Sequence, residues 1–309
     1  MDVTGFITTV FDGFVSLTIT VIPYFVIGVA FGALLETYTN KDFASRHIGD
    51  GASGVFKATL LGAFLPGCAC ATIPMARGLK ATGARLGVVS AFIMVSPLLS
   101  PHTLILNYGL LGLRFTVARI VASLIAAVIL GLVFNLLEKR RVPGFVSEPE
   151  EPPEANSAGD SCCSSDSCGC ESETRPTFWN SAKNITLELG KYFILGMLIA
   201  SILSALIPED GIAKYLGSSG VWAYASAIGV GIPLYVCEGE EIPIAQSLLK
   251  LGLGPGPTFA FLLGSVGTCI PTIIMAQKVI GRRPIIFYVI FWVFFAVISG
   301  ILFQSLTAS

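Results

Sequence analysis

The chain has 309 residues, of which 53% are hydrophobic and only 13% are charged, and its formal net charge is -1. A soluble domain carries about 25% charged residues, so this composition excludes an ordinary soluble globular protein. Because no basic cluster is interleaved with aromatic residues, it also argues against a nucleic-acid-binding protein. The mean hydropathy is positive, and we expect an integral membrane protein.

Long charge-free runs recur along the chain. About 20 residues in a helix cross the roughly 30 Å hydrocarbon core of a bilayer, and most of these runs are long enough to do so. The runs are 13–35, 58–76, 86–113, 215–237, 251–277 and 284–303. With two shorter runs, 120–137 and 192–208, they predict about eight to ten hydrophobic segments. The first run is full length and follows no basic region, so we expect no cleavable signal peptide.

Residues 139–183 interrupt this pattern. The stretch begins with three basic residues, becomes rich in glutamate and proline, and contains four cysteines. It cannot bury an apolar core, so we predict a flexible cytoplasmic linker between a first transmembrane repeat, 1–138, and a second, 184–309. The linker cysteines are Cys162, Cys163, Cys168 and Cys170. They could capture a soft metal near the membrane domain, or they could be an inert accident of low complexity.

The two halves carry one pattern at an offset of about 169 residues. Cys68 and Cys237 occupy matching positions in the segments 62–74 and 231–243. Each half predicts one long helix, a connecting turn, a pair of short helices interrupted by proline and glycine, a long helix and a final helix. We therefore expect an all-α membrane protein built from a duplicated unit.

The pairs of short helices span about 52–82 and 221–250. Roughly thirty residues are too few for two full crossings and a turn, so a re-entrant or broken hairpin is predicted, with its breaks enclosed by protein. Each half would then cross the membrane three times and contain one hairpin. Because three is an odd number, the second half starts on the opposite side of the membrane from the first, which predicts two inverted repeats. A parallel repeat with four crossings per half is the alternative.

Basic residues test this topology, because they concentrate in cytoplasmic loops. With both termini periplasmic, most lysines and arginines fall on the cytoplasmic side, whereas the parallel arrangement would mix them. The basic residues left outside are Arg114, Arg119, Lys214 and Lys250. Inverted repeats with both termini on the outer side of the membrane and the linker on the cytoplasmic side are therefore predicted.

Cysteines lie at the matching helix breaks. Cys68 and Cys70 stand at the break of the first half, Cys237 at that of the second, and Cys269 follows close to Pro271. A lone membrane cysteine is usually an apolar filler, but thiols at related breaks favour a soft ion, such as Cu(I), Zn(II), trivalent arsenic or mercury. These four cysteines are the predicted substrate-binding thiols. Of these four, Cys68, Cys70 and Cys237 are also predicted metal ligands. The four linker cysteines are predicted metal ligands as well.

Three carboxylates, Glu238, Glu240 and Glu241, adjoin Cys237 in an otherwise charge-free region. An ionisable group within a membrane span is costly and marks a functional site, so we predict that these glutamates couple transport to protons. The alternative, strongest for Glu241, is a cap that interacts with the dipole of the following helix. The first half has no matching carboxylate.

A second pair of matched breaks lies at 96–102 and 264–272. Unwound backbone there would offer carbonyls and hydroxyls to a ligand, so Ser96 and Thr268 are added to the predicted substrate site. A packing kink is the alternative. His102 is either a proton relay or a polar residue at a helix end. Gly28 and Gly32 in the first span predict close packing within the molecule rather than a dimer contact.

No phosphate-binding glycine loop followed by lysine is visible, so energy would come from an ion gradient or from the gradient of the substrate itself. We expect no cofactor and no enzymatic activity. The alternatives are a membrane thiol oxidoreductase that uses Cys68 and Cys70, and a sensor in which only the linker binds metal. The predicted partners are the metal or metalloid substrate, the lipid bilayer, protons as counter-ion, and a second copy of the chain, but no nucleic acid.

Three segments resemble the hallmark motifs of the ArsP/YraQ-type bacterial permease family. They are Pro66-Gly-Cys68-Ala-Cys70-Ala-Thr-Ile-Pro74, Ser96-Pro97-Leu-Leu-Ser100-Pro101 and Cys237-Glu-Gly-Glu240-Glu-Ile-Pro243-Ile-Ala245. The resemblance covers both membrane halves and implies an inner-membrane permease, with trivalent organoarsenicals among the family's substrates and proton-coupled efflux. The linker is similar to that of a subgroup assigned to copper and zinc efflux. Family patterns often have serine where this chain has Glu238, and the extra carboxylate tilts the expectation towards a cation.

Overall fold

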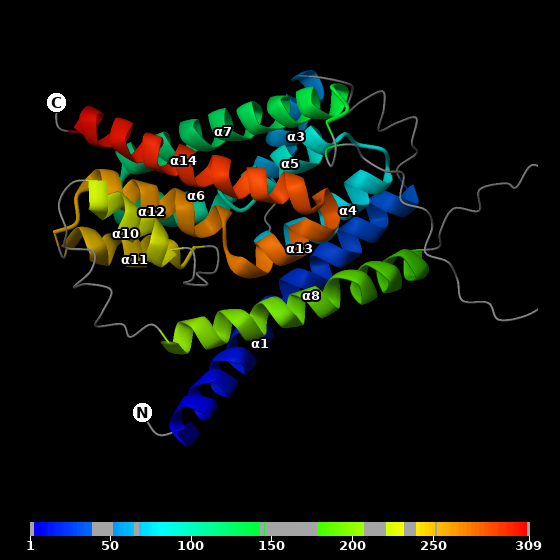
Figure 1. Cartoon of the computed structure of the whole chain (residues 1–309), viewed down its shortest axis with the longest axis horizontal. Helices are drawn as coiled ribbons and strands as arrows, with labels where there is room; N and C mark the ends of the chain where they lie inside the picture. The colour runs from blue at the N-terminus through cyan, green and yellow to red at the C-terminus, as the bar shows by residue number, and fades with distance from the viewer. Residues whose placement is uncertain are drawn as a thin grey trace, which may run out of the picture.

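The computed structural model describes residues 3–38, 52–64, 68–142, 145, 178–206, 221–231, 239–250 and 252–307, and every element within these ranges is an α-helix (Figure 1). The first half contains α1 (Val3–Tyr38), α3 (Ala52–Phe64), α4 (Ala69–Ala81), α5 (Leu86–Val95), α6 (Pro101–Leu111) and α7 (Leu113–Lys139). The second half contains α8 (Phe178–Leu206), α10 (Val221–Gly231), α11 (Glu241–Lys250), α12 (Pro255–Gly267), α13 (Ile270–Ile280) and α14 (Arg282–Thr307). The all-α prediction is confirmed, and each predicted hairpin contains two short helices, α3–α4 and α10–α11.

The breaks predicted at 96–102 and 264–272 are confirmed, and they divide the charge-free runs 86–113 and 251–277. Each region forms two helices, α5 and α6 in the first half and α12 and α13 in the second, and the axes of α12 and α13 are bent by 52°. Prolines explain the breaks, because proline lacks an N–H and disfavours helical backbone in the residue before it. Pro97 and Pro101 flank the first break, and Pro271 follows the second. Both halves therefore place irregular backbone inside the bundle.

Equivalent helices pack in the same way in the two halves. Helix α5 packs against α7 as α12 packs against α14, and α3 packs against α5 as α10 packs against α12. Every residue of α5 is buried, as is α12 from Gly256 onward, so these two helices form the centre of the molecule. In Figure 1, α7 runs from left to right whereas α14 runs from right to left, and α1 and α8 also run in opposite directions. Two helix pairs of the first half thus have counterparts in the second, and α7 and α14 run in opposite directions.

The outer surface is strongly apolar. Large side chains such as Ile105 (73% exposed), Phe294 (66%) and Leu198 (42%) point outward, which a soluble monomer would not tolerate over so wide an area. By length and composition, α7 and α14 can each cross a membrane, and up to four spans are counted if each of two bent helix pairs is one span. These features agree with the integral membrane protein expected from the composition.

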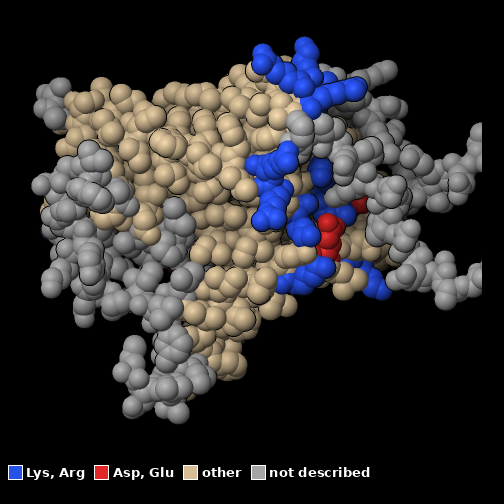
Figure 2. Space-filling model, in the orientation of Figure 1, with Lys and Arg blue, Asp and Glu red and all other residues tan. Residues whose placement is uncertain are grey.

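Lysine and arginine gather at one end of the molecule (Figure 2). This is the end where α7 finishes and α14 begins, so Lys139 and Arg282 lie there. The last turns of α4 and α13 add Lys80 and Lys278. We call this surface the basic end. The N-terminus of α1 and the C-terminus of α14 lie at the opposite end (Figure 1).

Glycines bring α1 against α4 at very short range. A Cβ added to Gly28 would lie 2.7 Å from the Cα of Ala71, and one added to Gly32 would lie 2.9 Å from the carbonyl carbon of Pro74. Only glycine permits this approach of two helix backbones. The prediction that Gly28 and Gly32 serve packing within the molecule is confirmed.

We predict that Gly28→Val lowers the free energy of unfolding by about 1–3 kcal/mol, because α1 must move away from α4 to admit the side chain. Chemical denaturation in detergent micelles measures the change. Gly190→Ala is the matched control, since no atom lies within 4 Å of a Cβ added to Gly190 on α8. Alanine there should leave stability unchanged or raise it by up to about 1 kcal/mol. Equal effects of the two variants would contradict the packing argument.

Candidate functional site

Thiols from the two halves lie where α4 and α13 begin. Cys68 precedes the first residue of α4, Cys70 is in its first turn, and Cys269 precedes the first residue of α13. The two helices pack against each other. Cys70 and Cys269 are buried and Cys68 is half-buried, and all three are free thiols.

The packing of α4 against α13 brings the helix starts that carry these thiols together. Cys68 and Cys70 stand at the start of α4, and Cys269 stands at the start of α13. The sulfur of Cys269 lies 2.6 Å from Oγ1 of Thr272, and the phenol of Tyr288 donates to the carbonyl of Gly267 at 3.0 Å. The structure therefore places the tip of the first hairpin near the break between α12 and α13. The sequence alone did not show that these two elements meet.

The thiol cluster is incomplete as a metal site in the described part of the chain. No three cysteine, histidine, aspartate or glutamate side chains there converge closely enough to hold an ion. The predicted ligand Cys237 and its neighbour Glu238 lie outside the described residues, as do the four linker cysteines. Their part in the site remains a prediction.

The two predicted hydroxyl ligands differ in their surroundings. Thr268 is buried and donates its hydroxyl to the carbonyl of Gly264 at 2.7 Å, as expected of a threonine that satisfies a helix break. Ser96 is also buried, but its Oγ finds no hydrogen-bond partner in the part of the chain that the structure describes. The same holds for Ser265, one turn before the α12–α13 break. Buried hydroxyls without partners are unusual in proteins, so both central breaks present polar atoms to the interior.

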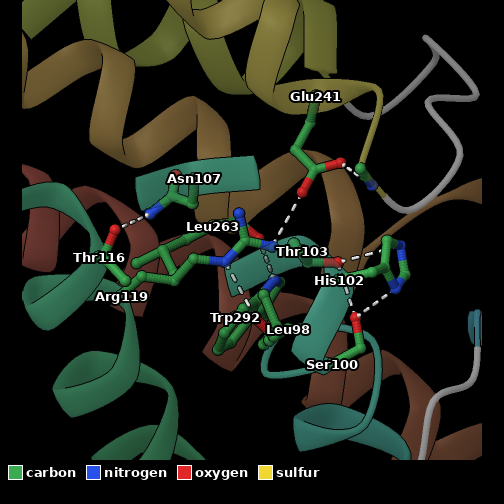
Figure 3. A network of polar contacts seen from close by, with 11 residues as sticks. Leu98, Ser100, His102, Thr103, Asn107, Thr116, Arg119, Glu241, Leu263 and Trp292 are labelled. Carbon is green, nitrogen blue, oxygen red and sulfur yellow. Dashed lines mark hydrogen bonds and ion pairs between the residues drawn. The ribbon is translucent and has the colours of Figure 1, made fainter. Parts of the chain in front are cut away.

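A fully buried ion pair joins the first half to the second. Nη2 of Arg119 on α7 lies 2.8 Å from Oε1 of Glu241 at the start of α11, and both side chains are 0% exposed (Figure 3). Nε of Arg119 donates to the carbonyl of Leu98 at 3.0 Å, in the break between α5 and α6. The other carboxylate oxygen of Glu241 accepts the backbone N–H of Gly239 at 2.6 Å. One arginine thus links the central break of the first half to the hairpin of the second.

One nitrogen of the Arg119 guanidinium makes no hydrogen bond to the described residues. This nitrogen, Nη1, is buried. Trp292 and Leu263 lie beside the guanidinium in Figure 3, where Nε1 of Trp292 donates to the Leu263 carbonyl at 3.0 Å. Both charges are shielded from solvent, since neither side chain is exposed, so they are poorly screened.

Sequence reasoning misplaced Arg119. The positive-inside analysis put it outside the membrane, whereas it lies within α7 and is wholly buried. The available signal was the apolar pattern on both sides of it, since Phe115 and Val117 precede it and Ile120 follows. These residues extend the predicted span 120–137 back to Leu113, and an arginine within a span is a functional candidate.

The predicted acidic residues prove to be inequivalent. Glu240 is exposed, whereas Glu241 is completely buried and paired. Glu241 lies in the first turn of α11, where a carboxylate interacts favourably with the helix dipole, and it also accepts the N–H of Gly239 in the preceding turn. Burial singles out Glu241 as the described carboxylate with the strongest claim to function.

His102 lies against the same turn. It is exposed at the start of α6, where Nδ1 is 3.2 Å from Oγ of Ser100. Ser100 also lies 2.7 Å from the hydroxyl of Thr103. A Cβ added to Gly239 would lie 3.5 Å from Nε2 of His102. An exposed titratable ring therefore adjoins the turn that holds Glu241.

A second ion-pair cluster connects the halves through α4. Nε of Arg77 lies 2.6 Å from Oε2 of Glu188 on α8, and its Nη1 lies 3.4 Å from Oε2 of Glu36 on α1. The side chain of Glu188 is 34% exposed, so solvent screens this cluster more than it screens Arg119 and Glu241. The two clusters differ chiefly in burial.

Comparison with known proteins supports the family predicted from the motifs. The model of the family ArsP_1, described as a predicted permease, matches residues 7–305. The chain is 23% identical to the UPF0718 protein MJ0584 of Methanocaldococcus jannaschii over 97% of each chain. It is 28% identical to the UPF0718 protein YraQ of Escherichia coli, over 84% of this chain and 70% of that one.

A third relative is the UPF0718 protein YcgR of Bacillus subtilis, which is 23% identical over 93% of this chain and 94% of that protein. No solved structure matches the chain significantly. The family model covers both helical halves and the segment between them, and its description is that of a transporter rather than an enzyme. The chain belongs to the ArsP_1 family of predicted permeases.

Proposed function

We propose that this permease exports a thiophilic metal or metalloid from the cytoplasm across the bacterial inner membrane, by alternating access coupled to protons. One observation carries the proposal: Cys68 of the first half and Cys269 of the second stand at the starts of α4 and α13, two helices that pack against each other. Thiolates bind soft ions by preference, and a trivalent metalloid or a linear Cu(I) centre can be held by as few as two sulfurs. Movement of one half against the other would make and break such a site.

The proposed topology is a pair of inverted repeats. It is supported by the reversed directions of α7 and α14 and of α1 and α8 (Figure 1), and by the equivalent packing in the halves. Under the positive-inside rule, the basic end in Figure 2 faces the cytoplasm. Both chain termini then lie on the periplasmic side. Inverted repeats with broken helices at mid-membrane are how many secondary transporters build their substrate sites.

The remaining site residues complete the proposal. Cys70, Cys237, Ser96 and Thr268 would line the pathway, and the linker cysteines would deliver the ion to the membrane domain. One of the glutamates Glu238, Glu240 and Glu241 would take up a proton as the substrate leaves.

We predict that Cys68→Ser or Cys269→Ser abolishes resistance to the true substrate, because serine lacks the soft sulfur ligand, and that Cys237→Ser does the same. The measurement is growth and metal accumulation in a sensitised bacterium exposed to arsenite, methylarsenite, copper, zinc or mercury, with membrane expression checked for each variant. Replacing all four linker cysteines is the control, and it should lower resistance only in part. Full resistance in the Cys68 and Cys269 variants would refute the thiol site.

A further inference from the structure

Arg119 and Glu241 lie on opposite sides of the boundary between the halves, and neither is in contact with solvent. Arg119 belongs to α7 of the first half, and Glu241 begins α11 of the second. Burying such a pair gains little stability over well-packed apolar side chains, because desolvation offsets the attraction of the charges. Its presence in a membrane protein therefore points to a role other than stability.

The pair is neutral as a whole only while Glu241 is ionised. A proton on Oε1 of Glu241 would remove the acceptor of the Nη2 hydrogen bond and leave the positive charge of Arg119 without compensation. Among the described residues, Nη1 of Arg119 already lacks an acceptor. An unpaired charge in apolar surroundings costs several kcal/mol, and the molecule can avoid this cost by moving α11 away from α7 and admitting water.

We propose that Arg119 and Glu241 form a proton-operated latch between the two halves, with Arg119 as the positioning residue that makes opening depend on protonation of Glu241. This inference rests on the proposed proton-coupled transport and assigns the coupling to one buried pair. With the pair ionised, the turn at Gly239 is held against α7 through Glu241. With Glu241 protonated, the turn is released, and the proton returns to water when the pair reforms.

The neighbouring groups agree with a latch at this position. Helix α11 packs against α6 and α12. Helix α12 presents no titratable side chain, whereas α6 presents His102 beside Gly239 and Tyr108, whose side chain is exposed. Glu240, on the same turn as Glu241, is also exposed. Among the described groups around this turn, Glu241 is therefore the one whose protonation alters a buried charge.

Hydrogen–deuterium exchange of the peptide 239–250, read by mass spectrometry on the full chain in detergent, tests the latch. The quantity is the ratio of exchange in a variant to exchange in the wild type at the same pH, which cancels the intrinsic pH dependence of exchange. We expect Glu241→Gln and Arg119→Gln to exchange about tenfold faster than wild type at neutral pH. The ratio should fall towards one in acid, where the wild-type latch is also open.

Two matched controls accompany these variants. Glu240→Gln removes the exposed neighbouring carboxylate, and Glu188→Gln removes the more exposed ion pair between the halves. Both should keep the ratio for peptide 239–250 near one at every pH. The double variant Arg119→Gln/Glu241→Gln leaves no buried charge, so it should fold even if a single variant does not, and it should show an elevated ratio at neutral pH that declines in acid.

A ratio that stays constant from neutral to acid pH in the Glu241 and double variants would overturn the latch and leave the pair a structural contact. A ratio of one throughout would also overturn it. Because no substrate is present, this outcome is separate from failure of the thiol site: loss of the substrate proposal would leave the exchange profile unchanged.

Discussion

Glu241→Ala is expected to lower the free energy of unfolding by about 3–5 kcal/mol, and Arg119→Ala by a similar amount. Each substitution leaves the other charge buried without its partner, which is the costly outcome for a desolvated ion pair. The double variant Arg119→Met/Glu241→Leu should cost far less than the sum of the single effects, because both charges are replaced by apolar side chains of similar length. Chemical unfolding in detergent micelles at neutral pH measures all three.

Glu240→Ala is the control for this cycle. The side chain of Glu240 is exposed, and its loss should change stability by no more than about 0.5 kcal/mol. The argument from burial fails if Glu240→Ala and Glu241→Ala are equally destabilising, or if the double variant is as unstable as the two single variants combined.

Trp292→Ala should destabilise the protein by about 3–5 kcal/mol, because it removes the largest fully buried side chain and leaves a cavity between α14 and α12. Trp292 also approaches Gly267 so closely that no Cβ could be added there. Trp292→Phe should cost less, since most of the ring volume remains and chiefly the hydrogen bond to Leu263 is lost. Unfolding free energy in micelles again provides the measurement.

Phe294→Ala is the matched control on the same helix, since this aromatic side chain is 66% exposed on the outer surface. It should cost much less than Trp292→Ala, because no cavity forms. A larger loss for Phe294 than for Trp292 would mean that the packing between α12 and α14 does not depend on the tryptophan. Because Trp292 adjoins Arg119 (Figure 3), its alanine variant should also raise exchange in peptide 239–250.

The central breaks illustrate what local sequence could predict. Pro97 and Pro271 were sufficient to place interruptions at the right points, because proline acts on the backbone of its own helix. Unwound backbone and a packing kink were both open from the sequence, and the structure shows separate helices, with a bend of 52° between α12 and α13. How far a broken helix turns depends on what packs against its ends.

The candidate site shows the corresponding limit. Cysteines at matching breaks suggested candidate thiols, but which of them share a region of the bundle depends on the packing of α4 against α13. Arg119 was missed because its partner is 122 residues away in the chain. A rule based on the charge of neighbouring residues cannot distinguish an arginine in a loop from one buried in a distant contact.

The sequence by itself determined that this is a helical membrane protein of two related halves, because hydrophobicity, proline and glycine act over a few residues. It also identified the Glu238–Glu241 segment as chemically unusual. Only the tertiary structure decided that Glu240 is exposed and Glu241 buried. Adjacent residues at the start of a helix point about 100° apart, and which direction faces the interior is fixed by the other half of the molecule, through Arg119.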